Sequence, residues 1–339
     1  TLRGIEPDQL RIPFEPDMAC DGLPSDIAPI WNPEFFGNTM VVNGRTWPVL
    51  NVEARRYRFR FLNGCNSRFV ILKMVTGDPA LRPATSALPF WQIGAEGGFL
   101  PAPVQLETLL MAPAERADAI VDFSGFPLGT EVFLINEGPD EPFGGGVPGT
   151  DFPYANPSTT GQVIKFVIGP AEGVDTSLDP ASLVLPALTP LGPEVRTRKV
   201  SLNEEESKAV RYVVDADGNW ILACDDPSAE VFGPSEALLG TVMDGAMPMG
   251  MPMGWMMPIT ETPVVGDTEV WELYNFTMDA HPIHIHEVQC EVVNREVFDP
   301  MLPGAGQVRG PEAWETGLKD TVIAYPGEIT RVKARFDIA

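Results

Sequence analysis

Arg56-Tyr57-Arg58-Phe59-Arg60-Phe61-Leu62 alternates charged and apolar side chains along its whole length. Successive side chains of a β-strand point to opposite faces, so this alternation predicts a half-buried strand. Just upstream, Asn38 to Val42 and Thr46 to Val52 flank Asn43-Gly44, and an Asn-Gly pair between two β-type runs is a strong signal for a hairpin. The chain around residue 56 is therefore expected to be β structure.

The same pattern continues on both sides of a proline-rich stretch. Further β-type runs in the first half are Phe69–Met74, Trp91–Ile93, Gln105–Met111, Ala117–Phe123, Glu131–Asn136 and Gln162–Ile168. Those in the second half are Arg198–Leu202, Val210–Val214, Thr268–Tyr274, Glu287–Asn294, Asp320–Ala324 and Thr330–Phe336. About nine strands before residue 170 predict a Greek-key sandwich. We expect an all-β chain with a linker or arm at 1–30, a domain at 31–170, a linker at 171–196 and a domain at 197–339.

Composition restricts the partners. The chain has 339 residues and a formal charge of -24, from 47 acidic and 23 basic side chains. Nucleic acid and anionic membrane surfaces would be repelled by this charge, so neither is an expected partner. Cations are the plausible charged partners, although solubility or salt adaptation also explains an acidic surface. No apolar run reaches the length of about 18 residues that a membrane-spanning helix needs.

The four cysteines, Cys20, Cys65, Cys224 and Cys290, are widely spaced and form no C-x-x-C pair. They therefore predict neither a zinc site nor a disulfide scaffold. Cys20 and Cys65 could pair in principle, but no spacing supports it. The cysteine pattern does not distinguish an oxidising from a reducing compartment.

All three histidines lie within His281-Pro282-Ile283-His284-Ile285-His286. Clustered imidazoles indicate transition-metal ligation, the alternative being histidines that are neighbours by chance in the core or on the surface. If residues 284–292 form a strand, His284 and His286 share a face while His281 lies across a proline at an odd spacing. We therefore expect His284 and His286 to serve neighbouring ions and His281 a separate one. No helical or Cys/His zinc motif is present.

Residues 243–257 (MDGAMPMGMPMGWMM) hold seven of the thirteen methionines. The interleaved proline and glycine are expected to exclude a helix and a regular ladder. Thioethers bind Cu(I), and a flexible methionine loop can also be an adaptable apolar lid near a substrate, so both roles stay open. The candidate residues are Met243, Met247, Met249, Met251, Met253, Trp255, Met256 and Met257.

Several segments resemble the multicopper oxidases, in particular the branch of bacterial spore-coat laccases, bilirubin oxidases and phenoxazinone synthases. The histidine segment, with 260–263 and 269–275 before it and 318–321 after it, resembles their third cupredoxin domain. Residues 42–48, 56–63, 93–98 and 112–118 resemble their second domain. The resemblance covers nearly the whole chain in order. It implies tandem cupredoxin-like Greek-key sandwiches, the second domain at 31–170 and the third at 197–339, the latter incomplete.

The resemblance also implies an activity. The family binds copper and oxidises small aromatic substrates (phenolic, aminophenolic or bilirubin-like) by one-electron steps while reducing dioxygen to water, which would make this chain part of a copper-dependent oxidoreductase. By resemblance His281 would bind the type 1 copper, His284 the type 2 copper and His286 a type 3 copper. A metallo-oxidase acting on Cu(I) or Mn(II) and a non-enzymatic copper-binding scaffold are the alternatives. Most of the family works outside the cytoplasm, so a periplasmic, secreted or spore-coat location is expected.

The chain departs from the family in its ligand set. Family members carry a C-terminal His-Cys-His segment and two His-x-His pairs in a first domain, and no further histidine exists here. The missing ligands are expected from sequence or chains beyond these residues, and the abrupt start at Thr1 and the end at Ala339 favour a fragment over a naturally truncated protein. Cys290, at a position that is usually aromatic in the family, is expected to be a buried structural thiol rather than a copper ligand.

Overall fold

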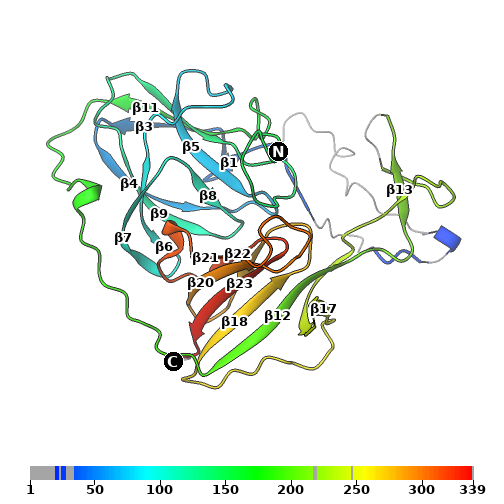
Figure 1. Ribbon diagram of the computed structural model, residues 1–339. Helices are drawn as coiled ribbons and strands as arrows, with labels where there is room; N and C mark the ends of the chain where they lie inside the picture. The colour runs from blue at the N-terminus through cyan, green and yellow to red at the C-terminus, as the bar shows by residue number, and fades with distance from the viewer. Residues whose placement is uncertain (1–19, 23, 28–33, 217–219, 246, 338–339) are drawn as a thin grey trace. The chain divides into compact units, whose positions relative to one another are not determined.

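The computed structural model describes residues 20–22, 24–27, 34–216, 220–245 and 247–337. These residues form β-strands and three short 3-10 helices, with no α-helix among them, so the all-β prediction is confirmed (Figure 1). None of the helices in this described part has the length and apolar character needed to cross a bilayer. The chain divides into a larger unit (36–200 and 259–339) and a smaller unit (1–35 and 201–258), and the predicted domain boundaries stay a prediction.

The first half of the larger unit is a β-sandwich. The hairpin predicted at Asn43-Gly44 forms between β1 (Val41–Val42) and β2 (Arg45–Thr46), and both turn residues have positive φ. One sheet has the order β3-β11-β10-β5-β8 and the other β4-β9-β6-β7. The strands are β3 (Val49–Glu53), β4 (Arg56–Leu62), β5 (Val70–Thr76), β6 (Phe90–Ala95), β7 (Gly98–Leu106), β8 (Leu109–Met111), β9 (Arg116–Asp122), β10 (Glu131–Asn136) and β11 (Gln162–Gly169).

The core of this sandwich fills the space between its two sheets. Met74 and Val132 of one sheet belong to the same buried cluster as Phe90, Val121 and Phe123. All five side chains are essentially inaccessible to solvent. Burial of each large apolar side chain contributes about 1.5–3 kcal/mol, so this cluster is the main source of stability for the first β series.

The second half of the larger unit places the histidines. Strands β18 (Thr268–Asn275), β23 (Glu328–Arg335), β20 (Cys290–Val297) and β21 (Val308–Arg309) lie side by side in this order, and β19 (His281–His284) pairs with β22 (Thr321–Ala324). The 3-10 helices are η3 (Pro180–Ser182) and η4 (Ala313–Glu315). β12 (Arg196–Glu205) begins in the larger unit and ends in the smaller one.

A shared apolar cluster joins the two halves next to the histidines. Phe69, Ile71 and Ala112 of the first β series are buried with Ala280 and Ile323 of the second. Because Ala280 directly precedes His281, the start of β19 is anchored on the first sandwich.

One strand boundary corrects a prediction. The strand expected from Glu287 starts only at Cys290, and Glu287 has a left-handed backbone (φ 66°) that interrupts any strand there. His284 ends β19, and His286 lies outside a strand. The assumption of one strand over 284–292 is therefore wrong, and the relation of His284 to His286 has to be taken from their side chains.

The smaller unit contains η2 (Cys20–Gly22), a sheet of β14 (Trp220–Leu222), β13 (Arg211–Val214) and β15 (Glu230–Val231), and a hairpin of β16 (Glu236–Met243) and β17 (Met249–Pro252). Cys20 forms a disulfide with Cys224, so the pairing considered with Cys65 is wrong. Cys65 and Cys290 are free thiols. Most of the predicted arm at 1–30 lies outside the described residues.

The methionine-rich segment does form a ladder, contrary to expectation. Met243 pairs with Met249 and Thr241 with Met251 in antiparallel register. β17 is the last strand of its sheet, where a proline removes no inner hydrogen bond, and Pro252 ends the strand. The prolines led to the expectation of irregular structure, but at the edge of a sheet they are compatible with a strand.

Candidate metal centre

His281 is the first residue of β19 and is held by the loop before it. Asn275, fully buried at the end of β18, donates from Nδ2 to the carbonyls of Asp279 (2.7 Å) and Ala324 (3.0 Å). Its Oδ1 accepts from the hydroxyl of Thr277 at 2.8 Å, and the same hydroxyl oxygen lies 2.6 Å from Nε2 of His281. Thr277 Oγ1 and His281 Nε2 therefore share a hydrogen bond that holds the ring of His281 against the loop before β19.

The protonation of His281 suits a ligand. Burial lowers the pKa of this imidazole, and the nearby carboxylate of Asp279 only partly opposes the effect. The neutral form is the one that binds a transition metal.

His284, the last residue of β19, is held through its other ring nitrogen, Nδ1. Its Nδ1 lies 2.8 Å from the backbone oxygen of Asp320, and a carbonyl oxygen can only accept. In the neutral ring the proton is therefore on Nδ1, which leaves the lone pair on Nε2 available to a metal. The ring is exposed, as expected for a residue that faces a further binding partner.

His286 completes the predicted set. It is exposed, and its ring centroid lies 4.8 Å from that of His284 with the planes tilted by 57°. The structure thus brings these two imidazoles together and places His281 in a separate environment. No group of three or more His, Cys, Asp or Glu side chains in the described part of the chain converges on a single metal position. Three imidazoles fit copper as donors, but further ligands are needed to complete each site.

Cys290 is buried in an apolar cluster of the second β series. Its Sγ donates to the backbone oxygen of Lys319 at 3.3 Å, and burial raises its thiol pKa to about 12. A metal-binding cysteine must be deprotonated, so this protonated thiol agrees with the structural role expected for it.

Sequence reasoning missed a charged cluster on the segment that holds His284. Lys319 Nζ lies 2.9 Å from Glu96 Oε2 and 3.0 Å from Glu115 Oε1, and all three side chains are almost fully buried. Glu96 and Glu115 belong to the first β series, at the β6–β7 turn and just before β9. The only sequence signal was the presence of charged residues at Glu96 and Glu115 between runs that form core strands, and this signal does not name their common partner.

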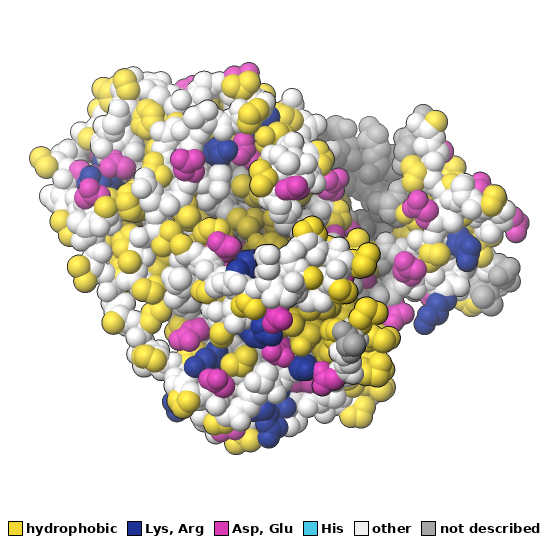
Figure 2. Space-filling view, in the orientation of Figure 1, with side chains coloured by type: hydrophobic (Ala, Val, Ile, Leu, Met, Phe, Trp, Pro, Cys, Tyr) yellow, Lys and Arg dark blue, Asp and Glu magenta, His cyan; other side chains and the backbone are white. Residues whose placement is uncertain are grey.

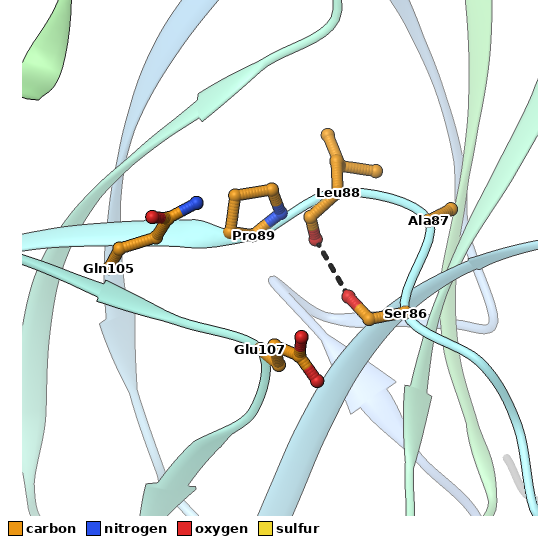
Figure 3. A pocket seen from close by; sticks show the side chains of 6 residues that line it. All are labelled: Ser86, Ala87, Leu88, Pro89, Gln105 and Glu107. Carbon is orange, nitrogen blue, oxygen red and sulfur yellow. Dashed lines mark hydrogen bonds between the residues drawn. The ribbon is translucent and has the colours of Figure 1, made fainter.

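Two hollows on the larger unit contain none of the predicted site residues. One, of about 360 Å³, is lined by Ser86, Ala87, Leu88, Pro89, Gln105 and Glu107; Figure 3 shows the bond from Ser86 Oγ to the Leu88 carbonyl at its edge. The other, of about 410 Å³, has Arg116 and Glu96 in its wall. Acidic side chains are dispersed over the face seen in Figure 2, without a single acidic patch.

The described residues are thus an all-β chain with three histidines on, or just after, one short strand. The chain belongs to the multicopper oxidase family, whose model matches residues 232–339. It is 33% identical to a laccase of Bacillus stratosphericus over 312 residues, 90% of this chain and 50% of that protein. It is also 33% identical to a laccase of Bacillus subtilis (strain 168) over 345 residues, 99% of this chain and 56% of that protein.

A solved structure agrees with the fold. The McoA multicopper oxidase from the hyperthermophile Aquifex aeolicus matches 91% of this chain and 56% of its own length, with a TM-score of 0.58 and 25% identity. The chain thus spans about half the length of the relatives it matches. The predictions of the family and of cupredoxin-like sandwiches are confirmed.

Proposed function

We propose that these residues are part of a laccase-like oxidase that takes single electrons from phenolic, aminophenolic or bilirubin-like substrates and passes them to dioxygen. The observation that carries the proposal is the division of the three histidines, since the rings of His284 and His286 lie together while His281 is held separately by Thr277. His281 would bind the type 1 copper, His284 the type 2 copper and His286 a type 3 copper. When bound, copper would accept the electrons one at a time and reduce dioxygen to water.

The protein's own residues have defined tasks in this proposal. Asn275 and Thr277 fix the ring of His281, while β19 carries His281 and His284 on one short segment. Pro282 and Ile283 would then give a short covalent connection between the two copper sites. The remaining ligands would come from the same or another polypeptide, and an extracytoplasmic location is part of the proposal.

The test uses the complete protein or complex that contains these residues, loaded with copper. We expect a His-Cys-His segment and His-x-His pairs in the flanking sequence or in a partner chain, and consumption of one dioxygen per four substrate electrons. His281→Ala and His284→Ala should abolish turnover, whereas Gln289→Ala, an exposed change three residues beyond His286, should not. Bound copper without dioxygen consumption would instead support the non-enzymatic scaffold.

A second function, oxidation of Cu(I) or another metal ion such as Mn(II), is favoured by the methionine hairpin. In antiparallel register Met243 faces Met249, and Met251 follows on the same face of β17; all three side chains are about half exposed. Trp255 and Met256 beyond the strand are almost fully exposed. Exposed thioethers on adjacent strands are suited to a soft cation.

The two functions separate by mutation of this hairpin. Replacing its seven methionines by leucine keeps the apolar volume but removes the thioethers, so metal oxidation should be lost while phenol oxidation is retained. Met278→Leu with Met301→Leu is the control, since both are exposed methionines outside the hairpin. Equal retention of both activities in the sevenfold variant would contradict the metallo-oxidase.

A further inference from the structure

The segment Leu318–Asp320, just before β22, is held by the first β series at three successive residues. Gly97 N donates to the Leu318 oxygen at 2.9 Å, Lys319 pairs with Glu96 and Glu115, and Asp320 pairs with Arg116. A Cβ at Gly97 would lie 2.5 Å from Leu318, so the approach of the two backbones requires glycine. The position of this segment is therefore set by the other sandwich.

Asp320 is the residue of this segment that contacts His284. Its backbone oxygen accepts from Nδ1 at 2.8 Å, and its carboxylate Oδ1 lies 3.3 Å from the same nitrogen. Thr321 donates its hydroxyl to Oδ1 at 2.8 Å, so the carboxylate is held from two sides, by Thr321 and by the guanidinium of Arg116. The imidazole proton thus faces oxygen acceptors only, and Nε2 points away from them.

We propose that Arg116 is a positioning residue for His284: by fixing Asp320 it holds the imidazole in the Nδ1–H form with Nε2 directed to copper. This inference rests on the proposed copper ligation by His284. Partners in the outer shell of a metal-binding histidine fix its tautomer and orientation, and their loss typically costs about 10–100-fold in metal affinity. A residue of the second cupredoxin-like domain would then tune a ligand of the third.

His286 supplies an internal comparison. Its ring contacts that of His284 but has no hydrogen-bond partner within the described residues, so its tautomer is not set through Arg116. Arg58 supplies a control variant, because it makes its own ion pair with Asp118, in the wall of the hollow that also contains Arg116. The Arg58 variant therefore separates the effect of losing any ion pair from the effect of losing the pair between Arg116 and Asp320.

The experiment is proton–nitrogen NMR of the metal-free chain labelled with ¹⁵N-histidine, in which only three rings contribute signals. The unmodified chain should show His284 in the Nδ1–H form. Arg116→Gln should convert His284 to a mixture of both tautomers, Arg116→Lys should restore part of the original form, and Arg58→Gln should leave it unchanged. Asp320→Asn keeps the backbone oxygen but weakens the anchor, and it should act in the same direction, which keeps the test valid if Arg116→Gln does not fold.

Titration of the same samples with Cu(II) separates this inference from the proposed function. The Cu(II) concentration that broadens the His284 signals should rise about 10–100-fold in Arg116→Gln but stay unchanged in Arg58→Gln. An unchanged tautomer and unchanged Cu(II) response at His284 in both Arg116→Gln and Asp320→Asn would overturn the positioning role. A chain whose His284 has the Nδ1–H form but does not respond to Cu(II) would instead contradict the proposed copper ligation.

Discussion

Replacing Lys319 by methionine should be among the most destabilising single changes in the larger unit. The Lys319 side chain is 3% exposed, and its partners Glu96 and Glu115 are 0% and 7% exposed. Removing one member of a buried charge cluster typically costs about 3–5 kcal/mol, because the charges left behind have lost both water and partner. Two carboxylates would remain here, so we expect Lys319→Met to fall in this range.

The pH dependence of this loss has a definite sign. Burial already raises the pKa of Glu115, an effect that Lys319 opposes. Without the lysine the folded state holds a proton that the unfolded state releases, so the free energy of unfolding rises as pH falls through the folded-state pKa. The deficit of Lys319→Met should therefore shrink below neutral pH, and adding Glu96→Gln and Glu115→Gln should recover more than half of it.

Urea denaturation followed by tryptophan fluorescence measures these differences. The control is Lys165→Met, which removes an ion pair of 2.7 Å with Glu131 whose side chains are 31% and 49% exposed. Such a surface pair contributes at most about 1 kcal/mol. If Lys319→Met is no more destabilising than this control, or if its deficit is the same at all pH values, the reasoning about an uncompensated buried charge is refuted.

Three further outcomes follow from other parts of the chain. Gly97→Ala should cost about 1–3 kcal/mol by overpacking and weaken Cu(II) binding at His284, whereas Gly64→Ala, with open space around its Cβ, should do neither by calorimetry and titration. Cys224→Ser should lower the free energy of unfolding of the smaller unit by about 2–4 kcal/mol, measured by urea denaturation, without changing that of the larger unit. Burial would raise the pKa of Glu315, but the hydrogen bonds and charge of Arg295 leave this pKa lowered. The stabilisation from the ionised carboxylate is therefore present at neutral pH and is lost as pH falls through the folded-state pKa. Glu315→Gln should accordingly make the melting temperature depend less on pH in the acid range.

The sequence predicted those features that depend on neighbours in the chain. Arg56–Leu62 alternates over its length and forms β4 with the same bounds, and Asn43-Gly44 makes the expected turn. Ligand candidates were also local, because three histidines in six residues need no structure to be noticed. By contrast, β19 was hidden by Pro282, which a strand in a two-stranded sheet can accommodate.

Features that depend on distant contacts could not be predicted. Lys319 meets Glu96 across 223 positions, and Cys20 meets Cys224 across 204 positions, so no short pattern records either pair. The backbone break at Glu287 likewise follows from how the chain leaves β19 to enter β20. At Glu287, tertiary packing therefore overrides the regular strand that the sequence pattern predicted.

His284 depends both on a local sequence pattern and on contacts with distant residues. His281 and His284 lie within six consecutive residues, yet Thr277 holds the ring of His281 from close by in the chain, whereas Asp320 holds the ring of His284 from 36 positions later. Asp320 is in turn anchored by Arg116, 204 positions earlier. A local motif therefore supplies the candidate donors, while contacts between the two β series orient His284, so under the proposed ligation a substitution in the first series would alter metal binding in the second without touching a ligand.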